Sequence, residues 1–452
     1  MRRFAPRVAI GSMSTALGAA EDSLVAGAGL GCEHPTTRSR ANPKNLITIA
    51  NIISPFSPAG LGRIIPPNGT AKNHRVAFPH MGIYEEIGVR PFINASGCMY
   101  TRFGGSIMAE PVVAAMAEAS KHFVNIFDLQ NRVGDAIAAM TRNESAFISC
   151  GAASGISLAV ATCIAGTDAN LADRLPDTHG IRNQIIISRC DRGTEADPAV
   201  RAAGGRIVEI GQPNTSRRAG SDEYLHAITD QTAAILFIAF ESEAELDVGR
   251  VISAAHEKNV PVLIDGACAV PPKENLWHYT RDLGVDAFIT SGGKGIRGPQ
   301  STGLVLGKRE IIEGCKFHSS PNLRIGRGMK VGKEEFAGIY TALKLFLAAD
   351  PAAEIARDIR RVAHIADALK NIPGILSCIV EKTRLQIKFD QAVFGITCEE
   401  AAKILLESDP SILLRGRDNR LTIHVNLLQD GEEELVARNL REFFTKRLQP
   451  PV

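Results

Sequence analysis

Short apolar segments alternate with helical segments over most of this chain, and this alternation limits its possible folds more than any other feature. The apolar segments are rich in β-branched residues and bounded by glycine, proline or charge, as in strands buried on both faces. Predicted strands span 145–149, 184–188, 206–210, 234–239, 261–265, 286–290 and 302–306. Helical segments separate most of them, for example 221–229 and 248–258. The pattern predicts an α/β fold with a mainly parallel seven-stranded sheet and helices on both faces.

The last of these strands is predicted to run antiparallel. Only a short turn containing glycine and proline precedes it, whereas a parallel crossover needs about a dozen residues or more. Further helices are predicted at 109–121, 130–141, 153–165, 333–347 and 352–370. The C-terminal part has predicted strands near 375–380, 384–389, 411–414 and 420–425, and a closing helix at 431–446. We interpret this part as a smaller α+β domain.

Residues 1–80 differ from the rest of the chain. They hold nine basic and three acidic residues, against 42 basic and 46 acidic residues in the remainder, and they lack sustained periodicity. We expect a basic, weakly ordered leader: a disordered extension, a weak export or organelle signal, or the result of a wrongly assigned upstream start codon. The predicted domains are therefore this leader at 1–80, a large domain with its N-terminal segment at 81–330, and a small domain at 331–452.

The composition limits the possible partners. A net charge of +2 gives no reason to expect nucleic acid or an anionic membrane, and no run of about 18 apolar residues indicates a membrane span. The nine cysteines are scattered without a CxxC pair, so no zinc ribbon, disulfide framework or other metal site is predicted. Reduced thiols and a cytoplasmic location are expected.

Lys294 lies in the segment Ser291-Gly292-Gly293-Lys294-Gly295, directly after a predicted strand. An incidental lysine in a flexible surface loop is one interpretation. The pattern is more typical of the lysine that forms a Schiff base with pyridoxal 5'-phosphate (PLP). The flanking glycines would let the backbone approach a ligand closely, and Ser291 is a candidate to bind the phosphate. A nucleotide P-loop is excluded, because no serine or threonine follows the lysine.

Asp265 ends the predicted strand 261–265 and lies 29 residues before Lys294. A carboxylate at the C-terminal end of a parallel strand points into the ligand crevice of such a sheet. Beside a pyridine nitrogen it would keep that nitrogen protonated, so that the ring can accept electrons. The simpler alternative is a cap on the following helix. Together with Lys294, Asp265 is predicted to form the catalytic pair.

A segment of small residues, Ser149-Cys150-Gly151-Ala152-Ala153-Ser154-Gly155, follows another strand and opens a helix. Small residues at a helix start expose backbone N–H groups, which together with the helix dipole form an anion site. We interpret Gly151, Ala152 and Ala153 as the cradle of the PLP phosphate. The motif is weak alone, and its place in the chain before Asp265 and Lys294 strengthens it.

Basic residues follow the lysine segment at Arg324, Arg327, Lys330 and Lys333. A solvated face explains any one of them singly. As a group they suit an anionic substrate group such as a phosphate, and we assign Arg327 and Lys330 to substrate binding. Arg415, just after a predicted C-terminal strand, is a candidate to bind an α-carboxylate through both nitrogens of its fork.

Together these features resemble the bacterial selenocysteine synthase (seryl-tRNA selenium transferase) family of PLP enzymes, and within it the D-glucosaminate-6-phosphate ammonia-lyase branch. The segments Gly88-Val-Arg-Pro-Phe-Ile-Asn94-Ala-Ser-Gly97 and Met329-Lys330-Val-Gly-Lys333-Glu334-Glu335 add to the likeness, which spans about residues 82–447. The resemblance implies an aspartate-aminotransferase-like fold with PLP on Lys294. It also implies a homodimer or higher homo-oligomer with sites at the subunit interfaces, and elimination of a β-substituent from an amino acid.

Two departures from the family pattern bear on function. True selenocysteine synthases hold tRNA with an N-terminal helical domain, which residues 1–80 do not resemble, so tRNA is not expected as a partner. Some relatives place a histidine over the PLP ring. Asp191 matches that position here and is a cofactor-binding candidate, although it cannot stack in the same way.

The sequence therefore predicts a PLP-dependent lyase of the ammonia-lyase or dehydratase type, acting on a small, anionic amino acid. Lys294 would hold the cofactor and remove the α-proton, and Asp265 would stabilise the electron-rich ring. Two alternatives stay open. One is a selenium or sulfur transferase acting on a seryl-type substrate, and the other is a catalytically silent PLP-binding protein.

Overall fold

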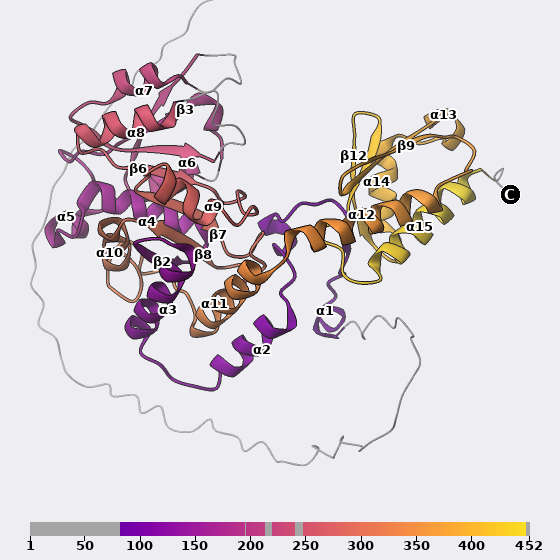
Figure 1. The fold of residues 1–452 in the computed structure, drawn as a ribbon, viewed down its shortest axis with the longest axis horizontal. Coiled ribbons are helices and arrows are strands. Elements are labelled where there is room, and N and C mark those ends of the chain that lie inside the picture. Colours follow the sequence, from indigo (N-terminus) through magenta and orange to yellow (C-terminus); the bar gives the residue numbers. More distant parts are fainter. Residues whose placement is uncertain (1–81, 195, 213–218, 240–246, 449–452) are drawn as a thin grey trace, which may run out of the picture. The chain divides into compact units, whose positions relative to one another are not determined.

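The computed structural model describes residues 82–194, 196–212, 219–239 and 247–448, and Figure 1 shows their fold. A seven-stranded sheet contains β2 (Ser145–Ser149), β3 (Gln184–Ser188), β4 (Arg206–Ile210), β5 (Thr232–Ile238), β6 (Val262–Asp265), β7 (Ala287–Ser291) and β8 (Gly303–Gly307). Each lies within two residues of a predicted strand. Short β-branched runs marked them correctly because the sheet is buried on both faces.

The strand order is β2-β8-β7-β6-β5-β3-β4. The strands β7, β6, β5, β3 and β4 pair in parallel, whereas β8 lies antiparallel between β2 and β7. The predicted antiparallel final strand is confirmed. The order and the helical layers are those of the aspartate-aminotransferase-like fold, so the predicted fold class is confirmed as well.

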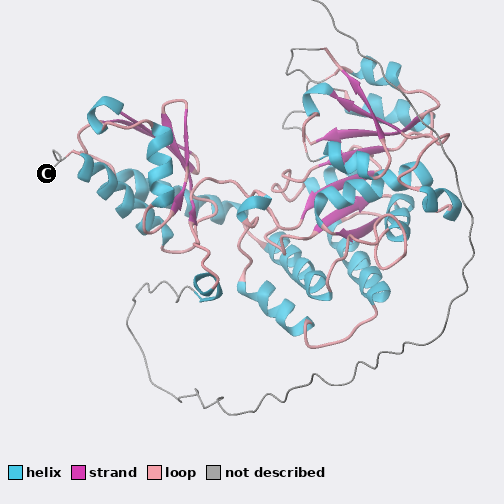
Figure 2. Cartoon of the chain, turned by 180° about the vertical axis from the view of Figure 1, so that it is seen from behind, coloured by secondary structure: helices cyan, strands magenta, loops and turns pink. Residues whose placement is uncertain are grey.

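Helices cover both faces of this sheet (Figure 2). One face packs on α3 (Ile126–Thr141), α7 (Ser221–Ala227), α8 (Val248–Glu257) and α11 (Lys333–Ala348), and the other on α4 (Gly151–Ala165), α6 (Ala196–Ala202) and α10 (Arg309–His318). The side chains of β6 show this division, because Ile264 belongs to the first core and Leu263 to the second. Helix α4 is apolar on nearly all sides, as expected for a helix enclosed by the sheet and other helices.

A smaller core forms in the C-terminal part of the chain. Four antiparallel strands, β9 (Ile375–Glu381), β10 (Arg384–Phe389), β12 (Arg415–Arg417) and β13 (Arg420–His424), lie in the order β12-β13-β10-β9. They pack with α12 (Pro351–Ala368), α14 (Cys398–Glu407) and α15 (Glu432–Arg447) around clustered phenylalanines such as Phe389 and Phe444. The predicted smaller α+β domain is present.

Two segments cross the predicted domain limits. Strand β1 (Ile93–Asn94) pairs in parallel with β11 (Ile412–Leu413), so the N-terminal segment joins the C-terminal core. Helix α11 packs against α2 (Glu110–Ala119) and contributes to the core of the large sheet. The limits at 80 and 330 otherwise stay predictions, and the leader 1–80 lies outside the described residues. None of the helices described here has the length and apolarity to cross a bilayer.

Candidate active site

Adjacent strand ends bring Asp265 and Lys294 to the same edge of the sheet. Asp265 is the last residue of β6, is buried, and accepts a hydrogen bond from the backbone N–H of Ala267 (3.0 Å). Strand β7 runs parallel to β6 and ends at Ser291, and the following turn, 292–296, carries Lys294. Lys294 Nζ lies 3.2 Å from Sγ of Cys268, three residues after Asp265. The predicted amine thus contacts the loop that follows the carboxylate, at the C-terminal strand ends where ligands bind in such sheets.

The glycines around Lys294 allow the turn to pack closely against the rest of the protein. A Cβ on Gly295 would lie 1.9 Å from the carbonyl oxygen of Val270, and one on Gly293 would lie 2.3 Å from Cα of Gln300. These positions are glycine because the turn packs against the protein's own backbone. The expectation that these glycines let the backbone approach a ligand stays a prediction, and the turn lies where it was predicted.

The predicted phosphate cradle lies beside Ser291. Helix α4 begins at Gly151, whose φ of +80° suits glycine, and the space where its Cβ would lie is open. Gly303 of β8 pairs with Ser291, and a Cβ on Gly303 would lie 2.7 Å from the backbone nitrogen of Ala152. Paired residues of antiparallel strands project to the same face, so Ser291 projects toward the start of α4. The helix N-terminus and the serine thus lie at one corner, and the assignment of this corner to the PLP phosphate stays a prediction.

Ala153 and Asp191 complete the predicted cofactor contacts. Ala153 is exposed in the first turn of α4. Asp191 is buried in the short helix Arg189–Asp191 that follows the C-terminal end of β3, and the Sγ of Cys190 lies 3.6 Å from its Oδ1. In the sheet β5 separates β3 from β6, so Asp191 lies at the same edge as Asp265.

Of the predicted basic residues at and before the start of α11, two contact other parts of the protein and two do not. Arg324 pairs with Asp173 and stacks over Phe317 at 4.6 Å, and Lys333 Nζ donates to the carbonyl oxygens of Ala119 and Ser120 at 3.1 Å each. These two residues hold the segment against the helix Ala169–Arg174, α10 and the C-terminal end of α2. Within the described residues, the side chains of Arg327 and Lys330 form no ion pair or hydrogen bond. No contact places either of them against Lys294 or Asp265, so their substrate role stays a prediction.

Arg415 lies beside the N-terminal segment rather than on an isolated surface. Its Nη2 is 2.6 Å from Sγ of Cys98, which is buried. Burial lowers the pKa of the nearby His424, and the positive charges of Arg415 and Arg384 lower it further. Arg415 thus lies near an imidazole whose pKa is lowered, and the positive charge of its guanidinium suits an anionic ligand.

Sequence reasoning missed a hollow next to the lysine turn. It holds about 410 Å³ and is lined by Arg102, Gly105, Ser106, Arg297 and Glu432, among others. Ser106 Oγ donates to the carbonyl oxygen of Gly293 (3.0 Å). The only available signal was an arginine three residues after the lysine, which a sequence alone cannot place in a cavity.

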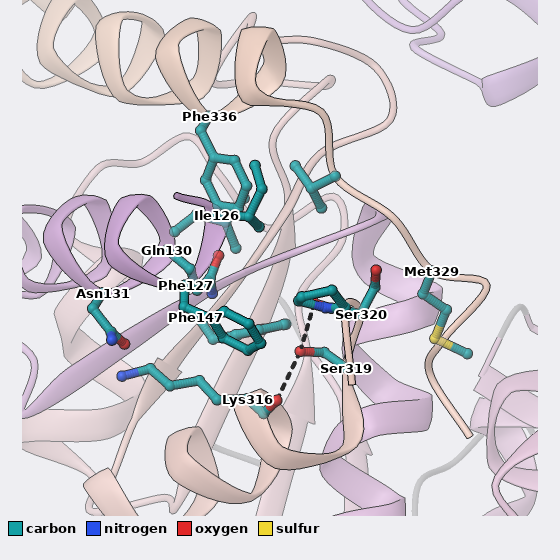
Figure 3. Close-up of a pocket in the computed structure, with 13 residues that line it drawn as sticks. Ile126, Phe127, Gln130, Asn131, Phe147, Lys316, Ser319, Ser320, Met329 and Phe336 are labelled. Atoms are coloured by element: carbon teal, nitrogen blue, oxygen red, sulfur yellow. Dashed lines mark hydrogen bonds between the residues drawn. The ribbon is translucent and has the colours of Figure 1, made fainter. Parts of the chain in front are cut away.

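A second hollow, drawn in Figure 3, is too small for an amino acid substrate. It holds about 50 Å³, between the start of α3 and residues 316–331. The buried Gln130 lines it, and its side-chain amide has no hydrogen-bond partner among the described residues. The rest of the lining is mainly apolar, and the volume is enough for a few water molecules at most. No described group of His, Cys, Asp or Glu side chains is arranged to hold a metal ion.

Comparison with known proteins agrees with this geometry. The chain is 28% identical over 375 residues to the D-glucosaminate-6-phosphate ammonia lyase of Salmonella typhimurium, covering 80% of this chain and 97% of the relative. It is also 28% identical over 381 residues to a 5'-C-glycyluridine monooxygenase-decarboxylase of a Streptomyces species, covering 79% and 91%. A solved structure of D-glucosaminate-6-phosphate ammonia-lyase superposes with a TM-score of 0.73 at 26% identity, over 82% of this chain and all of that one.

The family described as "SelA: L-seryl-tRNA selenium transferase" matches residues 92–397, which is more than half of the chain. An L-seryl-tRNA(Sec) selenium transferase of Desulfotalea psychrophila is 25% identical over 408 residues, covering 79% of this chain and 83% of the relative. The chain therefore belongs to the L-seryl-tRNA selenium transferase family and is an enzyme whose cofactor is pyridoxal 5'-phosphate.

Proposed function

We propose that this enzyme is a lyase that eliminates a β-substituent from a small, anionic amino acid. The observation that carries the proposal is the meeting of Lys294 with the loop that follows Asp265, at the edge of the sheet where ligands bind. The similarity to an ammonia lyase at both sequence and structure level supports lyase-type chemistry. D-glucosaminate 6-phosphate is the first substrate to test.

The residues present suit the pyridine nitrogen, the aldehyde and the phosphate of pyridoxal 5'-phosphate. Asp265 supplies a buried carboxylate for the pyridine nitrogen, and Lys294 supplies an amine for the aldehyde. The open space at Gly151, beside Ser291, suits the phosphate, because several backbone N–H groups and a hydroxyl converge there. We propose that Ala152, Ala153 and Asp191 contribute the remaining contacts.

When bound, the cofactor supplies an electron sink for the bond electrons released at the α-carbon of the amino acid. Lys294 then has two tasks: its amine holds the cofactor, and once substrate displaces it, the same nitrogen takes the α-proton. Asp265 keeps a proton on the pyridine nitrogen, and its burial strengthens that charge interaction. Departure of the β-group is helped if the proton held by Lys294 is passed to it.

Arg415, Arg327 and Lys330 are proposed to bind the anionic groups of the substrate. Arg415 can take a carboxylate through its planar fork, because only one of its nitrogens contacts Cys98. Arg327 and Lys330 have no ion-pair partner in the described residues and are free to meet a charged group. Their placement at the site would require movement or a second subunit.

We also propose that the enzyme is a homodimer or higher oligomer in the cytoplasm. Large apolar side chains around α2 and the start of α3 are exposed, including Phe123, Val124 and Phe127. Contiguous exposed apolar surface is typical of an interface between protein chains. Sedimentation of the purified protein tests this proposal, and a single monomeric species would contradict it.

The test of the lyase function measures release of ammonia and keto acid from D-glucosaminate 6-phosphate and from plain β-hydroxy amino acids. The variant Lys294→Ala should lose activity and the absorbance that borohydride abolishes. The matched control Lys403→Ala, on an exposed part of α14, should keep both. A Lys294→Ala protein with the same borohydride-sensitive chromophore would refute the assignment.

Oxidative decarboxylation of an amino acid is a second candidate, because the Streptomyces monooxygenase-decarboxylase is as similar in sequence as the ammonia lyase. Oxygen consumption and carbon dioxide release separate the two reactions. A lyase releases product equally well without oxygen.

Selenium or sulfur transfer remains a third candidate, supported by the family match and by the Desulfotalea relative. Addition of seryl-tRNA should then shift the protein on a native gel. Absence of a shift argues against a transferase.

A further inference from the structure

The hollow next to the lysine turn carries an excess of positive charge. Arg90, Arg102 and Arg297 line it, and Glu432 is the acidic residue in its lining. The Glu432 carboxylate accepts a hydrogen bond from the backbone N–H of Gln429 (2.7 Å). Burial raises the pKa of Glu432, so this acid offers less negative charge than an exposed carboxylate.

Two of the three guanidinium groups lack an acidic partner. Arg90 donates to the carbonyl oxygens of Glu407 and Ser408 and lies 3.9 Å from Asp409. Arg102 stacks over the ring of Phe103 at 4.8 Å, and among the residues of the structure that are described its guanidinium forms no hydrogen bond or ion pair.

Arg297 uses one nitrogen to donate to the carbonyl oxygen of Asn426 (3.0 Å), and no described carboxylate pairs with it. It is partly buried and has a φ of +59°. This left-handed conformation is unfavourable for a residue with a side chain, and such conformations are concentrated at ligand sites. The exposed Arg102 and the partly buried Arg297 thus present positive charge to an open space.

The walls of the hollow touch the turn that carries Lys294 from two sides. The backbone N–H of Arg297 donates to the carbonyl oxygen of Lys294 (2.9 Å), and Ser106 Oγ bonds to Gly293. A Cβ on Gly105 would lie 2.5 Å from the carbonyl oxygen of Gly293, so the contact is close. A ligand in the hollow would therefore affect the position of Lys294.

We propose that this hollow binds a phosphorylated organic anion, with Arg102 and Arg297 holding the phosphate. A guanidinium group matches phosphate geometry through two parallel hydrogen bonds. The volume of about 410 Å³ suits a small metabolite, and aromatic walls from Phe92 and Phe103 can cover its carbon skeleton. Either the remote phosphate of the substrate or a separate phosphorylated ligand has this chemistry, and the first of these sources rests on the proposed lyase function.

Calorimetric titration of the holoenzyme with inorganic phosphate tests the site. The cofactor phosphate already fills the corner at α4, so the probe reports on the hollow instead. The variants Arg102→Gln and Arg297→Gln should each weaken phosphate binding about tenfold or more, because each loses a charge-assisted hydrogen-bonding group. The control Arg132→Gln removes an exposed arginine of α3 that pairs with Asp128, and it should bind phosphate as the unmodified protein does.

The variant Arg102→Gln should keep the native fold, because the Arg102 guanidinium makes no hydrogen bond in the described structure. Weaker phosphate binding by this variant would therefore not result from misfolding. The proposal is overturned if the holoenzyme binds no phosphate at millimolar concentration, or if Arg102→Gln binds it unchanged. Calorimetry needs no turnover, so failure to find lyase activity leaves this test intact.

Competition identifies the source of the phosphate group. If D-glucosaminate 6-phosphate displaces inorganic phosphate while D-glucosaminate does not, the hollow holds the remote phosphate of the substrate. If D-glucosaminate 6-phosphate binds to the enzyme while inorganic phosphate stays in the hollow, the hollow holds a separate phosphorylated ligand. Either result supports a phosphate site that depends on Arg102.

Discussion

Gly303→Ala should weaken cofactor binding without replacing any residue that is assigned to contact the cofactor. Gly303 begins β8, and the first turn of α4 lies directly over it. An alanine Cβ would lie 2.5 Å from the carbonyl carbon of Gly151 and 2.7 Å from the nitrogen of Ala152. All of the nearest atoms are backbone atoms, so no flexible side chain can move aside.

The size of the effect follows from these distances. Carbon atoms in contact are separated by about 3.5–4.0 Å, so the start of α4 must shift by about 1 Å or β8 must withdraw. Overpacking of this kind costs about 1–3 kcal/mol of folding stability. A shift of about 1 Å also breaks a hydrogen bond between a backbone N–H of α4 and the cofactor phosphate. Loss of one such charge-assisted bond weakens binding by about tenfold or more.

Titration of the apo-protein with pyridoxal 5'-phosphate, followed by its absorbance, measures this affinity. The matched control is Gly166→Ala at the other end of α4, where φ is +56° and nothing lies within 4 Å of the added Cβ. Gly166 has φ +56° and ψ −133°, a backbone conformation that residues with a side chain rarely adopt. This control should therefore lose about 1–3 kcal/mol of stability, with unchanged cofactor affinity. Unaltered affinity in Gly303→Ala, or an equal loss in Gly166→Ala, would refute the reasoning.

Three further outcomes are expected. Asp265→Asn should retain bound cofactor but lower kcat about 100-fold or more in steady-state assays, because a neutral amide cannot hold the charge of a protonated pyridine; wild-type turnover would contradict the assigned role. Burial lowers the pKa of His318 below its ordinary value, so the unfolded chain takes up a proton at a higher pH than the folded protein does. The contribution of His318 to stability is therefore complete above about pH 6.5 and falls as the pH drops further. Urea midpoints should show this loss in the native protein but not in His318→Gln. Cys268→Ala should slow capture of the cofactor aldehyde by about fivefold in stopped-flow mixing, because Lys294 loses its contact with the thiol. Cys268→Ser should keep the native rate, since its hydroxyl can bond to Lys294. Equal rates in both variants would exclude the contact.

Helices were harder to predict from the sequence than strands, for identifiable reasons. Helix α10 was not predicted, and Gly314 in its middle weakens its helix signal. The structure requires that glycine, because a Cβ there would lie 2.0 Å from Cγ2 of Thr162 on α4. Helix α14 was also not predicted, although its capping box of Thr397 and Glu400 is visible in the sequence.

The candidate site likewise contains features that the sequence could predict and features that it could not. Asp265 and Lys294 could be predicted because one ends a buried strand and the other follows one, and strand ends are local features. The engagement of Lys333 by Ser120 could not, because more than 200 residues separate the two. The unpaired charge of Arg102 is likewise a property of the folded chain alone.

The antiparallel strand β8 explains why these distant segments form one site. Both β2 and β7 end opposite Gly303, so the helix that follows β2 and the turn that follows β7 begin at the same point of the sheet. The anion corner and the lysine turn are therefore held at a distance set by a single intervening strand. Asp265 joins them because β6 is the next strand, paired in parallel with β7. The order of strands, more than any one motif, places the amine, the carboxylate and the helix N-terminus where one aromatic aldehyde with a phosphate tail can meet all three.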